Sequence, residues 1–177
     1  MATDYTRDEI DVLIDLIRRD NSNKSLYPLM VSFGNPQVFT PTVDINRNTM
    51  IVATARPGYQ YHGSQTFYYN RVPLSKFVEP GVTDLTFDPF GKQFISDLLP
   101  ELNERLQIKL TADRIIDFNL PEIQDDEGGV DVLIQVLPAS LVYKDTLLVK
   151  LIRDSNDLYF AIPDVHMDGL TYAPPQV

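Results

Sequence analysis

The sequence predicts an α+β fold, with a largely antiparallel β-sheet or small sandwich covered by an N-terminal helix and a central kinked helical segment. Apolar residues recur at helical spacing near residues 8–20 and 92–106. Runs rich in β-branched and aromatic residues, separated by Gly, Pro and Asn, occupy much of the remaining chain. No repeat or linker divides residues 1–177, so we expect one domain.

The first element is expected to be a helix over residues 8–20. Thr6 followed by Glu9 predicts a capping box, in which the two side chains satisfy the first backbone N–H groups of the helix. Arg18 and Arg19 lie in the last turn, where the helix dipole favours cations. The stripe that should face the core consists of Ile10, Leu13, Ile14 and Ile17.

An antiparallel hairpin is expected next. A short strand over 29–33, which residues 37–39 continue after a turn, precedes two longer strands over 48–55 and 65–72. Because side chains alternate along a strand, Phe67 and Tyr69 should share one face and Tyr68 should lie on the other.

The remaining elements are shorter. Residues 74–78 predict one helical turn, and 92–106 predict a helix that Pro100 kinks or divides into two. Thr111 is expected to cap a short helix through Asp117. Strands are expected over 82–87, 130–137, within 141–153 and over 158–161, and an extended C-terminal arm over about 169–177.

Composition excludes several function classes. The 177-residue chain carries a formal net charge of −10 without a basic run, which argues against nucleic-acid binding. It has no cysteine, so disulfides and thiolate metal sites are excluded. No apolar run approaches the roughly 20 residues of a membrane span, and the acidic N-terminus does not resemble a signal peptide.

Motifs that carry chemistry are also missing. Neither a phosphate-binding glycine loop nor a nucleophile elbow occurs. The two histidines, His62 and His166, fall in separate expected loops, and the acidic run 125–127 lacks the ligand spacing of a calcium loop. We therefore expect no catalytic residue, no cofactor-binding residue and no metal ligand, and predict that the protein is not an enzyme.

Aromatic residues around the hairpin are the remaining functional signal. Tyr59, Tyr61 and Tyr68 are candidate interface residues, because tyrosine buries a large area at low entropic cost. A packed hairpin with ordinary edge tyrosines, or a platform for sugars, also accounts for them. Extended arms often order on a neighbouring subunit, so Tyr172, Pro174 and Pro175 are further candidates.

Several short motifs follow one another from about Ile10 to Pro175, and the most specific are Arg47-Asn48-Thr49, Pro57-Gly58 and Tyr69-Asn70-Arg71. Their order resembles that of a family of uncharacterised structural domains in the virions of large tailed bacteriophages. Later matching segments are ISDLLPELNERLQIKLTADRIIDFNLPE, VLPASLVYKDTLLVKL and GLTYAPP. The resemblance implies a virion component and no known catalytic residue; a heavier aromatic loop, Tyr59 to His62, departs from the family pattern.

We therefore expect a bacteriophage virion structural protein of the tail, baseplate, neck or capsid surface. It would be assembled in the host cytoplasm and pack against copies of itself and other virion proteins. The alternatives are a binding module for carbohydrate or a host receptor and, from another class, a cell-wall hydrolase, which would need a pair of carboxylates in a cleft.

Overall fold

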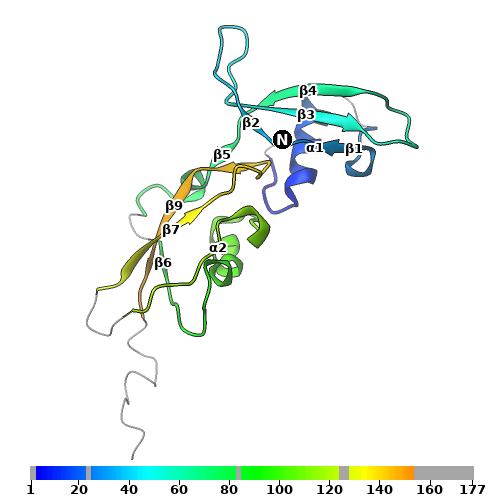
Figure 1. The fold of residues 1–177 in the computed structure, drawn as a ribbon. Coiled ribbons are helices and arrows are strands. Elements are labelled where there is room, and N and C mark those ends of the chain that lie inside the picture. The colour runs from blue at the N-terminus through cyan, green and yellow to red at the C-terminus, as the bar shows by residue number, and fades with distance from the viewer. Residues whose placement is uncertain (1–2, 23–24, 83–84, 124–127, 154–177) are drawn as a thin grey trace, which may run out of the picture.

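A computed structural model describes residues 3–22, 25–82, 85–123 and 128–153 and shows the predicted α+β fold (Figure 1). Among these residues, no helix is both long and apolar enough to cross a membrane. The expected strand over 158–161 and the C-terminal arm over 169–177 lie outside the described residues.

Sheet A is an antiparallel sheet built around one central strand. Strand β3, the longest in this sheet, pairs on one side with the full length of β4. On its other side it pairs with β1 near its C-terminal end and with β2 near its N-terminal end. The strands are β1 (Val31–Phe33), β2 (Gln37–Val38), β3 (Thr49–Ala55) and β4 (Ser64–Tyr69). The predicted hairpin is therefore confirmed.

Two further sheets carry the C-terminal half, so the strands form three separate groups. One contains the parallel pair of β5 (Val72–Pro73) and β8 (Tyr143–Lys144). In the other, β9 lies between β6, which is parallel to it, and β7, which is antiparallel. The strands of this third sheet are β6 (Thr86–Phe87), β7 (Val130–Gln135) and β9 (Thr146–Leu151). The pairing is largely antiparallel, as predicted.

The N-terminal helix, α1 (Glu9–Asp20), forms as expected, but its capping differs from the prediction. Asp8 is the N-cap residue, and Thr6 donates its hydroxyl hydrogen to Asp4 instead of capping the helix. Glu9 points into the protein. The buried stripe differs from the expected one as well: Val12 is buried, whereas Ile10 is 39% exposed.

The central segment contains two short helices that meet end to end, one of the two forms predicted for it. A 3-10 helix (Ile95–Leu98) runs directly into α2 (Leu99–Leu106). Pro100 occupies the first turn of α2, where its missing N–H costs no helical hydrogen bond. Thr111 was expected to cap a helix through Asp117, but its hydroxyl donates to Asp113 and only a 3-10 turn, Ala112–Arg114, follows.

The buried apolar side chains form one continuous core that extends from α1 through α2 to β9. Its largest fully buried members include Tyr143, Phe87 and Leu13. A short 3-10 turn at Pro28–Met30 leads from α1 into β1, and another at Leu74–Phe77 lies between β5 and β6. Sheet A therefore rests with one face on the core, and its other face points outward (Figure 1).

Candidate interaction site

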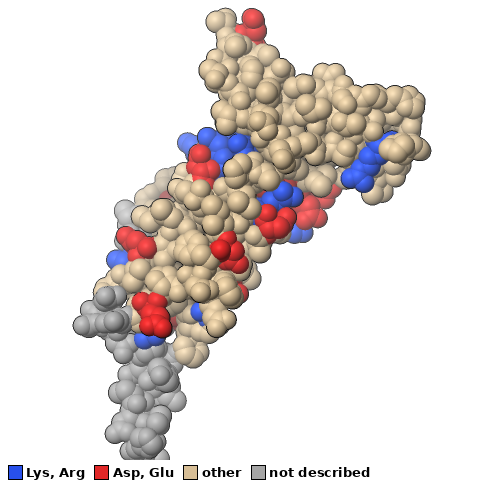
Figure 2. All heavy atoms as spheres, viewed as in Figure 1, with Lys and Arg blue, Asp and Glu red and all other residues tan. Residues whose placement is uncertain are grey.

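Sheet A and its loops are built from a segment that is almost free of charge. Between residues 25 and 70, only Asp44, Arg47 and Arg56 are charged, although 23% of the whole chain is charged. In Figure 2, the region over β3 and β4 is mostly tan, whereas red and blue side chains are scattered over the region of α2, β7 and β9. The formal net charge of −10 is therefore carried mostly outside this segment.

The outer face of sheet A combines apolar and hydroxyl side chains. Val52 and Tyr68 on this face are 45% and 39% exposed. The Thr54 and Ser64 hydroxyls lie 3.0 Å apart across the two strands. The Tyr68 ring meets the Phe39 ring edge to face, with the centroids 4.8 Å apart. The opposed pairs of this face are Met50 with Tyr68, Val52 with Thr66, and Thr54 with Ser64.

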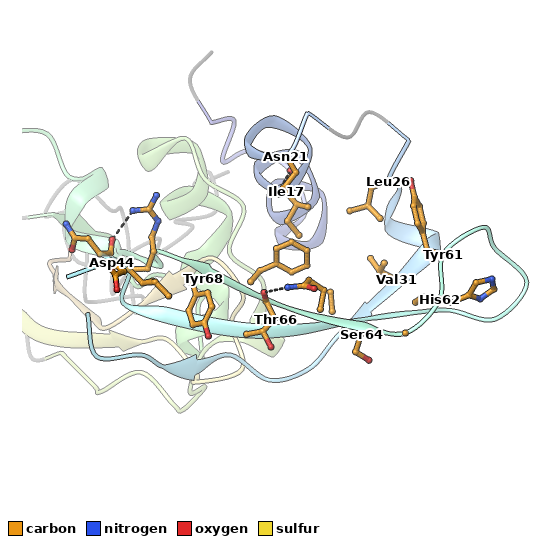
Figure 3. A pocket seen from close by; sticks show the side chains of 18 residues that line it. Ile17, Asn21, Leu26, Val31, Asp44, Tyr61, His62, Ser64, Thr66 and Tyr68 are labelled. Carbon is orange, nitrogen blue, oxygen red and sulfur yellow. Dashed lines mark hydrogen bonds between the residues drawn. The ribbon is translucent and has the colours of Figure 1, made fainter. Parts of the chain in front are cut away.

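A groove of about 800 Å³ lies on the inner side of sheet A, beside α1 (Figure 3). Its apolar lining comes from α1, the segment that follows it and the inner face of β3 and β4. Its polar lining comes from side-chain amides, from the loop between β2 and β3, and from Ser64, Thr66 and Tyr68, so the groove also runs along β4. The lining includes Ile17, Asn21, Leu26, Val31, Asp44, Arg47, Ala53, Tyr61, His62, Gln65 and Phe67.

Two of the predicted interface tyrosines meet at the groove. Tyr61 packs in part against the core and lines the groove, and Tyr68, on the outer face of sheet A, lines it as well (Figure 3). Tyr59 is 39% exposed in the loop that joins β3 to β4 and is not part of the groove lining. The three residues therefore do not form one patch. Tyr172, Pro174 and Pro175 lie outside the described residues.

Two sequence motifs that are 22 residues apart meet at the ends of β3 and β4. The Asn48 backbone N–H donates to the Asn70 carbonyl oxygen of the side-chain amide (2.9 Å), and the Arg71 N–H donates to the Asn48 side-chain oxygen (3.0 Å). The Arg71 guanidinium, buried with its side chain, also donates to the main-chain oxygens of Pro138 and Ser140. These contacts join sheet A to the turn before β8. The motifs therefore have a structural role.

Glu9 belongs to the same buried network. Its carboxylate accepts hydrogen bonds from the Ser140 hydroxyl (2.6 Å) and the Leu141 N–H (2.7 Å). The Tyr69 hydroxyl donates to the Leu141 carbonyl at 2.6 Å. Burial raises the pKa of Glu9, against the lowering effect of its hydrogen bonds and of Arg114, and burial also raises the pKa of Tyr69. Ser140 is fully buried, so its hydroxyl is closed to solvent, whereas Glu9 also lines a surface pocket with Lys109 and Arg114.

The groove presents binding chemistry rather than paired acids and bases. Its lining holds one carboxylate, Asp44, and one histidine, His62, and Figure 3 shows them at opposite ends. Within the described part of the chain, no three His, Asp or Glu side chains cluster closely enough to hold a metal ion. Apolar, aromatic and amide groups, such as Phe67, Tyr61 and Gln65, suit the binding of a peptide or a sugar.

Sequence reasoning found the aromatic hairpin but missed the groove and the buried network. The depletion of charge over residues 25–70 was visible in the sequence and would have marked the whole of sheet A. The role of Glu9 had no local signal, because Ser140 lies 131 positions away.

A comparison with known protein families shows where the chain belongs. The model of a family of unknown function (DUF7941) matches residues 2–177, nearly the full length of the chain. No curated protein and no solved structure matches it. The chain belongs to this family.

Proposed function

We propose that this member of the family is a non-enzymatic structural subunit of a tailed-bacteriophage virion, assembled in the host cytoplasm. It acts by packing against copies of itself and other virion proteins. The observation that carries the proposal is the charge-poor sheet A, which exposes its outer face on an otherwise acidic chain. The order of the sequence motifs, which resembles that of phage structural domains, supplies the virion context.

Charge depletion supports a protein partner for physical reasons. The centres of protein interfaces are poor in charged residues and rich in aromatic residues, because a buried charge must be paired to offset its lost hydration. The outer face of sheet A follows this pattern with Met50, Val52 and Tyr68. The charged surface elsewhere keeps the free subunit soluble and disfavours unspecific association.

A second exposed apolar pair supports contacts with more than one neighbour. Leu133 of β7 and Leu148 of β9 lie opposite each other and are 50% and 56% exposed. An assembly subunit needs at least two contact surfaces to be joined on both sides, and these leucines lie on a different sheet from Tyr68. The C-terminal arm over 169–177 remains a predicted third contact.

Quantitative mass spectrometry of purified particles tests the proposal. The chain should co-purify with particles at a fixed copy number per particle. The ratio of this chain to the other virion proteins should be the same in every particle-containing gradient fraction. A chain that is abundant in the infected cell and absent from particles would remove the structural assignment.

A binding module for carbohydrate or a host receptor is the second candidate, and the groove favours it. Tyr61 lines this concave site together with the side-chain amides of Asn21 and Gln65, which is the combination that sugar recognition uses. A glycan array with the purified chain tests this candidate. Binding that is lost in Gln65→Ala would support it, and an array without hits would reject it.

A further inference from the structure

Strand β4 is an open edge of sheet A. Among the described residues it pairs with β3 alone. The Ala55 N–H donates to the Gly63 carbonyl oxygen at 2.9 Å, so residues 63, 65 and 67 exchange hydrogen bonds with β3. By alternation, the N–H and C=O groups of Ser64, Thr66 and Tyr68 point away from β3, along the open edge.

A side-chain contact agrees with this assignment. The Thr66 carbonyl oxygen accepts a hydrogen bond from the Gln65 side-chain amide at 3.2 Å, drawn as a dashed line in Figure 3. Because Gln65 is exposed, this contact competes with water and is readily exchanged for another donor.

The edge lacks the features that normally keep edge strands apart. Soluble proteins block such edges with lysine, proline, an inward charge or a bulge. The β4 sequence, Ser-Gln-Thr-Phe-Tyr-Tyr, contains no charged residue and no proline, and its pairing with β3 runs without a bulge from Ser64 to Tyr69. A free edge of this kind is a template for another strand.

We propose that β4 pairs antiparallel with β4 of a second copy, centred on Thr66, so that two copies of sheet A form one continuous sheet. This inference rests on the proposed function and names the first contact within it. Thr66 lies opposite Thr66 of the partner subunit, Ser64 lies opposite the partner's Tyr68, and Tyr68 lies opposite the partner's Ser64. These three pairs exchange about six main-chain hydrogen bonds, which is the largest number that the outward groups of 64, 66 and 68 allow.

Charge explains why the occupant is a second copy. Two chains of net charge −10 repel each other at most surfaces, and the segment from 25 to 70 is where they meet with the fewest charges. No carboxylate on β4 opposes a carboxylate of the partner, and Thr–Thr is a favourable cross-strand pair. The two-fold pairing also extends the uncharged outer face across both copies, so that it presents a wider surface to further neighbours.

Cysteine cross-linking tests the register, because the natural chain has no cysteine. In Thr66→Cys, the two Cα atoms of a directly opposed pair lie about 5.5 Å apart, within disulfide range. In the control Ser64→Cys, the matching atoms lie roughly 14 Å apart, four residues along the strands, and are out of range. Under mild oxidation, Thr66→Cys should form a covalent dimer and Ser64→Cys should not.

A second variant tests the hydrogen bonds without disturbing sheet A. Thr66→Pro removes an N–H that β3 does not use, and prolines are tolerated at such edge positions. Loss of one N–H on each copy should weaken the dimer by roughly tenfold to a hundredfold in sedimentation equilibrium. Thr66→Lys should weaken it as well, through two opposed cations, and circular dichroism of each variant should match that of the parent.

The outcomes separate this inference from the proposed function. A chain found in particles at fixed copy number but monomeric in solution, or dimeric without the Thr66→Cys cross-link, would overturn β4 pairing and leave the structural role standing. A dimer whose affinity Thr66→Pro leaves unchanged would also overturn the pairing. The cross-link in a chain absent from particles would support the pairing and overturn the virion role.

Discussion

Replacing Tyr69 with phenylalanine removes one hydroxyl group from the junction between sheet A and the C-terminal half. That hydroxyl donates to the Leu141 carbonyl at 2.6 Å, in a site where the Tyr69 side chain is 8% exposed. The variant loses a net hydrogen bond and leaves a buried carbonyl without this donor, at a cost of about 1–2 kcal/mol. For a chain of this size, the melting temperature should fall by roughly 2–8 °C.

Tyr68 offers a matched control on the same strand. It lies on the opposite face, is 39% exposed and meets Phe39 through its ring, which phenylalanine retains. Tyr68→Phe should therefore change the free energy of unfolding by about 0.5 kcal/mol or less. Urea unfolding of both variants gives the comparison. Equal losses at the two positions would refute the buried network as the source of the junction's stability.

A double-mutant cycle extends the same test. The Leu141 N–H donates to Glu9, and the Leu141 carbonyl accepts from Tyr69, so the two side chains bind the two main-chain groups of the same residue. Residues that share a partner in this way are coupled by about 0.5 kcal/mol or more. Tyr69→Phe and Glu9→Gln should therefore be non-additive. Strict additivity would show that the two contacts are independent.

The remaining predictions concern the buried charges and one glycine. Burial raises the pKa of Glu9 above 4.5, so the parent should gain stability relative to Glu9→Gln as the pH falls through the raised pKa, and this gain should level off below about 4.5. Urea unfolding at several pH values measures the difference. A loss of relative stability as the pH falls would contradict the prediction. Arg71→Met should cost roughly 3 kcal/mol, because the guanidinium serves two main-chain oxygens, whereas exposed Arg47→Met should cost about 0.5 kcal/mol or less in the same assay. Gly129→Ala should lower the melting temperature more than Gly58→Ala. Both glycines have positive φ, 95° and 87°, but a Cβ at 129 would lie 2.7 Å from the Leu151 main-chain oxygen, whereas one at 58 would meet open space. Equal melting temperatures of the two variants would contradict the close approach at Gly129.

Local patterns explain which parts of the fold were predictable. The span of α1, the β3–β4 hairpin and the opposite faces of Tyr68 and Tyr69 follow from periodicity within a few residues. The division of the central helix followed from Pro100, whose ring restricts the chain locally.

Long-range contacts explain what the sequence did not reveal. Glu9 was assigned to a capping box because its neighbours fit that pattern, but partners 131 and 132 positions away determine its actual place. The parallel pairs β5–β8 and β6–β9 likewise join segments that are more than 60 residues apart. For the candidate site, alternation indicated that Tyr68 faces outward. The edge position of β4 among the described strands and the shape of the groove depend instead on how distant segments pack around it.

The most direct test of the central claim is hydroxyl-radical footprinting of the chain alone and in purified particles. Oxidation of Met50 and Tyr68, on the outer face of sheet A, should fall in the particle, while that of Tyr27, 49% exposed outside this face, reports general shielding. Stronger protection of Met50 and Tyr68 than of Tyr27 is the predicted result. Equal oxidation of Met50 and Tyr68 in the free and assembled states would contradict the claim that neighbours cover this face.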